Sequence, residues 1–315
     1  MTEREALLRA VCENPDEDTP RLVFADWLQE NGDEERAEFI RLQIELVGMR
    51  DGKAKQKKQA REKELLKAHQ VDWTAPLKEF EGNRTGDYYV FRRGFVEAIA
   101  SDGEIMVEEG DRVFALAPIR EIVFADEEEY GELAKCKWLL KLHTLDLKGS
   151  GLSHHFDPTP LIRSRYLANL TALCLAGEDD NGHLDMAGVE ALVSSKYLGK
   201  VEELDLSGNW LNQFDRNTVI TLLRAENLPA LRRLLMRGVG LDEVDAAVIA
   251  QSAWLSKLKQ LNLSRNTIRA PGMMSLAKSR HLAGLELLDL RDNLEPLPDS
   301  VRQSLKDRFG DRVLL

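Results

Sequence analysis

The stretch Leu258-Lys-Gln-Leu261-Asn-Leu263-Ser-Arg-Asn266-Thr-Ile268 places apolar residues and one asparagine at fixed spacings, in the pattern LxxLxLxxNxI. The pattern returns over residues 201–211 and, without its last position, over residues 285–293. Degraded copies begin at Leu142, Leu170 and Leu231. Consecutive copies start 27 to 31 residues apart, as from 258 to 285 and from 170 to 201. Chance does not place so many copies in register, so we interpret them as repeats of one structural unit.

A period just under thirty residues with this pattern is typical of the leucine-rich repeat. Each such unit cannot bury its own apolar face, and stacking of neighbouring units creates one continuous core. The sequence therefore predicts an α/β fold. It is a leucine-rich-repeat horseshoe solenoid with a parallel β-sheet on its concave face and helices on its convex face, preceded by an N-terminal all-α module.

The leucines of the pattern are expected to point into the core, because successive side chains of a strand alternate between its two faces. The predicted core comprises Leu142, Leu145, Leu147, Leu170, Leu173, Leu175, Val201, Leu204, Leu206, Leu231, Leu234, Met236, Leu258, Leu261, Leu263, Leu285, Leu288 and Leu290. Asn209, Asn266 and Asn293 are expected to hydrogen-bond backbone groups where the chain leaves the strand, since a buried amide without partners is costly.

Apolar periodicity between the strands predicts helices over residues 187–197, 217–225, 243–254 and 271–280. In the third of these, Val244, Ala247, Val248 and Trp254 are expected to face inward. The period leaves room for a full helix, and the repeats in this respect resemble the ribonuclease-inhibitor type. A last helix over 301–309 and an edge strand over 312–315 are expected to close the solenoid.

Helix signals also fill the first seventy residues. Thr2 and Glu5 form the sequence signature of a capping box at the start of a helix that reaches residue 13. Thr19 and Pro20 are expected to cap and begin a second helix, and Asp33 a third. A fourth, highly charged helix is expected over residues 53–69. Apolar runs at 88–91 and 94–99 predict strands that cap the solenoid, and residues 119–124 predict a degenerate repeat.

The run PRLVFADWLQENGD at residues 20–33, followed by RAEFIRLQ at 36–43, resembles the repeat-companion domain. This domain stands at the N-terminus of many bacterial repeat proteins, and the match covers about residues 1–50. The resemblance implies a cytosolic bacterial repeat protein and implies no activity. The polar residues of the motif either form a binding surface or, as we favour, a network of hydrogen bonds and ion pairs between short helices. They are Asp26, Asp33, Arg36, Glu38, Arg41 and Gln43.

We therefore predict a helical repeat-companion module over residues 1–80 and a leucine-rich-repeat domain over residues 81–315. Within the second domain, residues 81–141 form an N-terminal cap with degenerate repeats. Residues 142–297 form the main repeats, and residues 298–315 form the C-terminal cap.

The chain carries 43 Lys and Arg against 54 Asp and Glu, a net charge of −11. This balance argues against general binding to nucleic acids or anionic membranes, which requires concentrated positive charge. The lysines between residues 53 and 67 form either a small electrostatic patch or, as we favour, the solvated face of a helix. No apolar run reaches membrane-spanning length, and the N-terminus lacks a signal-peptide pattern. Three cysteines without CxxC spacing indicate reduced thiols, so a cytoplasmic protein is expected.

No hydrolase, zincin, P-loop or dinucleotide-binding motif occurs in the sequence. Adjacent His154 and His155, with His143 nearby, lack a third ligand at metal-site spacing. The acidic loop 177–184 either binds a cation such as calcium or, as we favour, is simply solvated. Cys174 is expected to have acidic neighbours, which would raise its thiol pKa and oppose a nucleophilic role. We therefore expect no enzyme activity, no metal and no cofactor.

Residues between the pattern leucines are expected to face outward on the sheet and to provide the binding surface. Arg233, Leu235 and Arg237 combine an exposed leucine with two arginines, a composition favoured at interface centres. The alternative is that Arg233 pairs with Glu203 and Arg237 with Asp205, as ordinary surface ion pairs. The candidate protein-binding residues are Arg233, Leu235, Arg237, Glu203, Asp205, Cys174, Trp210, Asp289 and Arg291.

The sequence thus favours a non-catalytic interaction scaffold that binds a protein partner through the concave face and rim loops. A second interpretation is a substrate-recruiting or targeting subunit of a larger enzyme system, docked through the helical module. An enzyme that uses a cluster at the rim is a third. Partner identity and oligomeric state are left open, and neither nucleic acid nor a membrane is expected as a partner.

Overall fold

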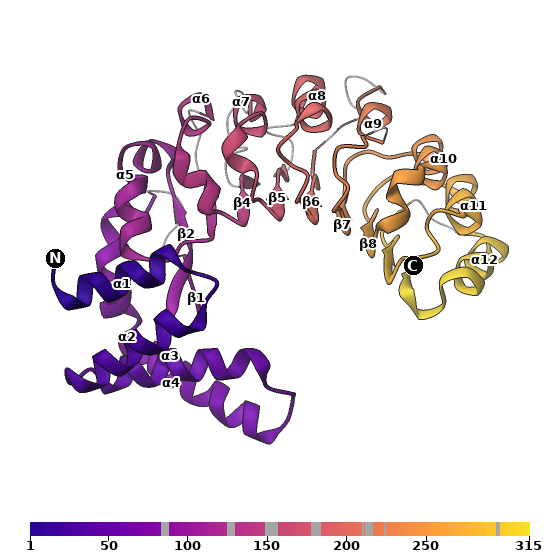
Figure 1. The fold of residues 1–315 in the computed structure, drawn as a ribbon. Helices are drawn as coiled ribbons and strands as arrows, with labels where there is room; N and C mark the ends of the chain where they lie inside the picture. The colour runs from indigo at the N-terminus through magenta and orange to yellow at the C-terminus, as the bar shows by residue number, and fades with distance from the viewer. Residues whose placement is uncertain are drawn as a thin grey trace. The chain divides into compact units, whose positions relative to one another are not determined.

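A computed structural model describes residues 1–82, 88–124, 130–148, 157–177, 184–209, 211, 217–223, 225–293 and 297–315 (Figure 1). The chain forms two compact units, Met1–Val123 and Phe124–Leu315, called unit 1 and unit 2 below. Residues 81–123, assigned from the sequence to the repeat domain, therefore lie in the same unit as the N-terminal helices.

Unit 1 contains the four helices that the sequence predicts. Its elements are α1 (Glu3–Glu13), α2 (Asp18–Glu30), α3 (Glu34–Gly48), α4 (Lys53–Thr74), η1 (Ala75–Phe80), β1 (Tyr89–Arg92), β2 (Phe95–Ser101), α5 (Gly103–Leu116) and β3 (Glu121–Phe124). The capping box of α1 is confirmed: the Glu5 backbone N–H donates to the Thr2 hydroxyl at 3.2 Å, and the Thr2 N–H donates to the Glu5 carboxylate at 2.7 Å.

The predicted start of the second helix is wrong. Helix α2 begins at Asp18, after Glu17, which makes no side-chain cap. Pro20 is therefore the third helical residue. The helix tolerates it there because the first N–H groups of a helix have no intrahelical acceptor, so the missing proline N–H removes no bond. Helix α5 was not predicted at all, and it buries Met106, Val113 and Phe114.

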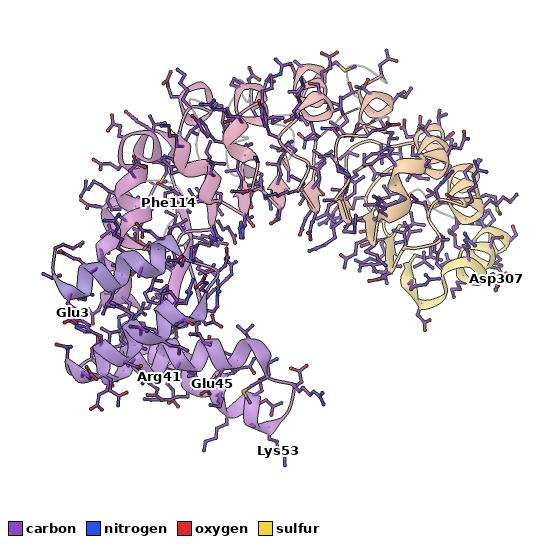
Figure 2. The ribbon with its side chains drawn as sticks, in the orientation of Figure 1. Glu3, Arg41, Glu45, Lys53, Phe114 and Asp307 are labelled. Carbon is purple, nitrogen blue, oxygen red and sulfur yellow. The ribbon has the colours of Figure 1, made fainter. Side chains whose placement is uncertain are left out.

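The polar residues of the N-terminal motif bind one another, their own helices or neighbouring elements of unit 1, as Gln43 binds Glu62 on α4 and the N–H of Gly94 in the hairpin. Arg41 on α3 pairs with Asp26 on α2 at 2.7 Å, and Arg41 is labelled in Figure 2. The Asp33 carboxylate accepts from the Arg36 N–H and caps α3. Arg61 on α4 donates a hydrogen bond to each carboxylate oxygen of Glu38, at 2.9 and 2.7 Å. These contacts are those of a structural network between helices, the interpretation that the sequence favours.

The hairpin of β1 and β2 is fixed to these helices by its turn. Arg93 and Gly94 both have positive φ, +49° and +86°, and a Cβ atom on Gly94 would lie 2.6 Å from the Cα atom of Ile40. Only glycine allows this close approach. Beside the turn, the buried side chains of Arg21 and Glu97 form an ion pair at 2.7 Å. This pair connects α2 to β2 inside unit 1.

Unit 2 repeats one motif, a three-residue strand followed by a return segment with a short helix. Figure 1 shows the strands along the inner side of this unit and the helices along its outer side. Its elements are α6 (Tyr130–Leu133), η2 (Lys137–Lys141), β4 (Thr144–Asp146), α7 (Thr159–Ile162), η4 (Arg165–Leu167), β5 (Ala172–Cys174), α8 (Met186–Ser194), β6 (Glu203–Asp205), α9 (Asn217–Leu222), β7 (Arg233–Leu235), α10 (Glu243–Gln251), η5 (Ala253–Lys257), β8 (Gln260–Asn262), α11 (Ala270–Lys278), β9 (Leu287–Asp289), α12 (Asp299–Phe309), η6 (Gly310–Arg312) and β10 (Val313–Leu314).

Strands β4 to β10 pair in parallel and in chain order. From β4 to β9 the central leucines face one another across every pair, as Leu234 faces Leu261 and Leu261 faces Leu288. Every predicted core residue of the repeats is buried, and none is more than 3% exposed. The pattern of leucines is thus confirmed as the core of unit 2.

The predicted asparagine hydrogen bonds are confirmed. The Asn266 side-chain amide donates to the carbonyl of Met236 in the preceding repeat at 2.8 Å and to that of Leu263 in its own repeat at 3.0 Å. Asn209 and Asn293 bridge successive repeats in the same way. This asparagine ladder satisfies backbone groups where each strand ends.

A serine ladder joins the repeats before each strand begins, and it was not predicted. The Ser279 hydroxyl donates to the carbonyl of Ala250, two residues before the equivalent serine of the preceding repeat, Ser252, at 2.6 Å. The other serines of the ladder are Ser164, Ser195 and Ser252. Its sequence signal is a serine two residues before Tyr-Leu, Trp-Leu or His-Leu.

The inward face of α10 differs from the prediction. Val244 is 51% exposed, whereas Ala246, Ile249 and Ala250 are buried. The capping box at Asp242 fixes where the helix starts and thereby its rotation. Ala247 is consequently only partly buried and does not belong to the core.

Candidate functional site

The outward residues of the sheet in unit 2 form three rows that run across the strands. Figure 2 shows the side chains on the strand side of this unit, opposite the helices. The first row is Thr144, Ala172, Glu203, Arg233, Gln260 and Leu287. The middle row is Asp146, Cys174, Asp205, Leu235, Asn262 and Asp289. The third row, two residues after the middle one, is Lys148, Ala176, Ser207, Arg237, Ser264 and Arg291.

The middle row has a structural role that the sequence analysis missed. The carboxylates of Asp146, Asp205 and Asp289 each accept a hydrogen bond from the backbone N–H two residues later, at 2.8, 2.8 and 3.1 Å. Asn262 accepts in the same way at 2.9 Å. These are Asx turns, which hold the chain where it leaves the strand. A sequence signal existed, because Asp or Asn stands between two leucines in each of these repeats.

Leu235 is the exception in the middle row. Its side chain has no polar atom and cannot accept the N–H of Arg237. That N–H instead donates to the Ser207 hydroxyl of the neighbouring repeat at 3.2 Å. The half-buried Leu235 therefore sits between Asp205 on β6 and Asn262 on β8 as an apolar residue in a polar row. No turn geometry requires a leucine at this position.

The charged residues around Leu235 are unequally paired. Arg233 binds Glu203 of the neighbouring strand at 2.7 Å, as the surface-pair alternative predicts. The expected pair between Arg237 and Asp205 does not form. Arg237 is exposed and makes no ion pair within the part of the chain that the structure describes. Its guanidinium is thus available to a ligand.

Asp289 and Arg291 bind each other at the end of the sheet face. The Arg291 guanidinium donates two bonds to the Asp289 carboxylate, at 2.9 and 2.6 Å. Burial alone would raise the pKa of Asp289, but the hydrogen bonds and charge of Arg291 outweigh it and lower that pKa. Asp289 is only 5% exposed, so Arg291 is the member of this pair that a partner can reach.

Cys174 lies between Asp146 on β4 and Asp205 on β6. Burial, followed by these neighbouring carboxylates, raises the pKa of its thiol far above the ordinary value. The expected direction is confirmed. A thiol in this state is a poor nucleophile near neutral pH, because the thiolate is the reactive form.

This raised pKa gives a testable expectation for Cys174. In a variant with Cys12→Ser and Cys136→Ser, iodoacetamide at pH 8 should modify Cys174 at least about tenfold more slowly than it modifies glutathione, because little thiolate is present well below the pKa. The measurement is the alkylation rate by mass spectrometry. An unfolded sample in denaturant supplies the control and should react like glutathione. Equal rates in the folded and unfolded samples would refute the raised pKa.

Some expected site residues lie outside the described residues. Trp210, His154, His155 and the interior of the acidic loop, 178–183, are among them. Within the described residues, no group of three His, Cys, Asp or Glu side chains is placed to hold a metal ion. No helix in this same part of the chain is long and apolar enough to cross a bilayer.

Comparison with known proteins gives likenesses of structure. No family model matches the sequence. No curated protein matches it either. A crystal structure of a protein from Bacteroides fragilis has a TM-score of 0.50 at 19% identity, over 69% of this chain and 65% of that one. An internalin (inlF) from Listeria monocytogenes has a TM-score of 0.39 at 18% identity, over 64% of this chain and 49% of that one.

A third likeness is to human 5T4 (Wnt-activated inhibitory factor 1, trophoblast glycoprotein). Its TM-score is 0.40 at 18% identity, over 63% of this chain and 69% of that one. The chain thus spans less than two thirds of the length of the first two proteins. At these identities a likeness concerns the fold alone. The leucine core, the parallel register and the asparagine ladder identify that fold as an α/β leucine-rich-repeat solenoid with an N-terminal helical region.

Proposed function

We propose that this chain is a non-catalytic scaffold that binds a protein partner through the sheet face of unit 2 and the loops at its rim. The observation that carries the proposal is Leu235. Other described residues of the middle row either close an Asx turn or, at Cys174, receive the Ala176 N–H, whereas Leu235 does neither. Because Leu235 closes no turn and faces outward, we explain the leucine at this position by an apolar contact with the partner.

The groups around Leu235 suit a protein ligand. Arg237 offers a planar set of donors that matches a carboxylate, and no described carboxylate occupies it. Interface centres combine such arginines with apolar side chains that lose their water on binding. Arg233 with its partner Glu203, and Arg291 with Asp289, are then the charged rim of the same surface. Trp210, which follows Asn209 directly, is proposed as a further contact.

The chemistry of the sheet face supports a binding role over catalysis. Its one thiol has a raised pKa. The carboxylates of Asp146 and Asp205 accept backbone hydrogen bonds and so help to hold turns. A catalytic acid or base must instead reach a substrate.

The wider assignment of the chain is also a proposal. The helices of residues 1–80 form a repeat-companion module, supported by the motif residues that bind α2, α3 and α4 together. We also propose residues 81–315 as the repeat domain, with its cap, main repeats and closing segment, although residues 81–123 fall in the compact unit of the helices. The nine-residue helices α8, α10 and α11 support the ribonuclease-inhibitor type. A cytoplasmic bacterial protein is proposed from the resemblance of the N-terminal motif and from three cysteines, one of them buried, that form no disulfide within the described residues.

A substrate-recruiting role is the second candidate function. It is favoured by the division of the chain into two compact units. Unit 1 has hydrophobic clusters of its own, such as that around Phe24 and Phe95. In this case unit 1 would dock on an enzyme and unit 2 would hold the substrate. Two different partners, each captured by one unit, would favour this role over a simple scaffold.

The proposal is tested with a double variant, Leu235→Glu with Arg237→Glu. The unaltered chain and the variant are used for affinity capture from a lysate of the source organism, and captured proteins are identified by mass spectrometry. A partner of the sheet face should bind the variant at least about tenfold more weakly, because both the apolar contact and the cation are lost.

The matched control is Val244→Glu with Lys306→Glu, which makes the same chemical changes at exposed residues of α10 and α12. Circular dichroism establishes that all three proteins fold. If partners bind the Leu235 variant as well as they bind the control, the sheet-face proposal is wrong.

A further inference from the structure

Unit 2 carries a group of cations that contrasts with the net charge of −11 of the chain. They lie in the segments that lead into β4, β5 and β6, at the ends of the strands opposite the asparagine ladder. The same segments expose two apolar side chains. We name this surface the cationic flank and define it by Lys137, Leu140, Arg163, Arg165, Lys196 and Tyr197.

Hydrogen bonds join the segments of the cationic flank from repeat to repeat. The Asn169 side-chain amide donates to the Leu140 carbonyl at 2.8 Å, and its oxygen accepts from Lys200 at 2.8 Å. Arg165 and Tyr197 also interact: the pKa of the Arg165 guanidinium is raised mainly by the hydroxyl of Tyr166 and further by that of Tyr197. Because adjacent strands lie about 4.8 Å apart, these residues form one continuous surface.

The cations of the flank are exposed and carry no bound anion from their surroundings. Lys137, Arg163, Arg165 and Lys196 make no ion pair within the residues that the structure describes. Like charges on successive repeats repel one another and create a positive potential on this surface. An anionic ligand that spans several repeats would remove the repulsion.

Apolar groups lie among these cations. Leu140 and Tyr197 are each 39% exposed, although the neighbouring Leu139 and Leu198 are fully buried. These side chains offer a ligand apolar contacts between the charged ones. A ligand that matches the flank therefore needs negative charges on both sides of an apolar group.

We infer that the cationic flank binds an acidic polypeptide segment that carries an apolar side chain among its carboxylates. An extended segment advances about 3.3 Å per residue, so its alternate carboxylates recur every 6–7 Å. Adjacent strands lie about 4.8 Å apart, and the segments outside the sheet lie further apart. The spacing of the carboxylates therefore matches that of cations on successive repeats. The surface is separate from Leu235 and Arg237, and the inference does not depend on the proposed function.

A polypeptide is favoured over a nucleic acid by the aromatic groups. Nucleic-acid surfaces of this kind offer free aromatic faces on which bases stack. Here the guanidinium of Arg165 lies 4.8 Å from the centre of the Tyr166 ring and covers it. Tyr197 is the one aromatic residue in the flank as defined, whereas stacking of successive bases needs an aromatic face for each base. The net charge of −11 also repels a long polyanion that extends beyond the flank.

The test uses a fluorescent twelve-residue peptide of Asp and Glu with a central Leu-Phe pair. Its companion peptide replaces every acid by Asn or Gln. Fluorescence anisotropy at low salt measures binding to the full chain. The flank variant carries Glu in place of Lys137, Arg163, Arg165 and Lys196. The control variant carries Glu in place of Lys53, Lys57, Lys63 and Lys67, exposed residues of α4 with the same total charge change.

The acidic peptide should bind the unaltered chain and the control variant, and the flank variant should bind at least about tenfold more weakly. Its affinity should fall as salt is added. The neutral peptide should bind at least about tenfold more weakly than the acidic one. The double variant Leu235→Glu with Arg237→Glu should bind the acidic peptide like the unaltered chain, which separates this inference from the sheet-face proposal.

Three results would overturn the inference. The first is absence of binding by the acidic peptide, and the second is equal loss in the flank and control variants. The third is tighter binding of a uridine 20-mer, lost in the flank variant, which would assign the surface to nucleic acid. A milder variant, with Gln at the same four flank positions, guards against misfolding and should show a smaller loss in the same direction.

Discussion

Replacing Glu97 with alanine is expected to lower the free energy of unfolding of unit 1 by about 3–5 kcal/mol, because it leaves a buried cation without its counter-ion. Arg21 is fully buried and its partner Glu97 is 4% exposed. The Arg21 guanidinium would keep its bonds to the carbonyls of Pro15, Arg92 and Arg93. These bonds engage its two terminal nitrogens, while its buried Nε has no hydrogen-bond partner, and they do not neutralise its charge. Urea denaturation followed by circular dichroism measures the change.

The double variant Arg21→Met with Glu97→Leu is the control for this prediction. Both charges are absent, so no unpaired ion is buried, and most of the lost stability should return. Glu5→Gln, at the exposed capping box, is a second control and should cost less than about 1 kcal/mol. If Glu97→Ala is no more destabilising than the double variant, the cost is one of packing and the electrostatic explanation is wrong.

Replacing Asn266 with alanine is expected to destabilise unit 2 by roughly 3 kcal/mol. Its side chain donates to the carbonyls of Met236 and Leu263 and accepts from the N–H groups of Val239 and Leu241. Asn266 is 5% exposed, so water replaces few of these bonds. Each buried backbone group left without a partner costs about 1–3 kcal/mol.

The measurement is again urea denaturation, with Asn169→Ala as the control in the same unit. Asn169 has two hydrogen bonds in a more exposed place and its loss should cost less than about 1 kcal/mol. Hydrogen exchange locates the damage, which should centre on residues 236–241 and 263–268. A loss of stability equal to that of the control would show that the ladder contributes little.

The sequence predicted the core of unit 2 because inward and outward residues alternate along each strand. Leu204 and Leu261, for example, are buried where the pattern places them. Helix rotation was less predictable, since α10 has nine residues and a hydrophobic pattern that fits more than one face. Val244 faces solvent because the cap at Asp242 decides the start of the helix. Helix α5 was missed although its buried residues Met106, Gly110, Val113 and Phe114 recur at helical spacing, so the signal was present in the sequence.

The sequence predicted where the candidate site lies, but not which of its side chains are held by hydrogen bonds or ion pairs within the chain. The pattern placed Asp205, Leu235 and Asp289 on one outward row, as the register confirms. It could not show that the aspartates bind their own backbone, because an Asx turn depends on the angle at which the chain leaves the strand. The same limit hid the fact that Arg237 makes no ion pair among the described residues, since pairing between repeats depends on side-chain rotamers.

The parallel register has a consequence for how such a surface changes during evolution. The inward residues and most of the middle row stabilise the fold, and Asp146 and Asn262 in that row close turns. Under the proposed function, recognition then falls mainly to exposed residues of the first and third rows, such as Arg233 and Arg237, which can vary without disturbing the core. Leu235 is the exception in the middle row: under the proposed function, a position that closes a turn in other repeats contacts a partner instead.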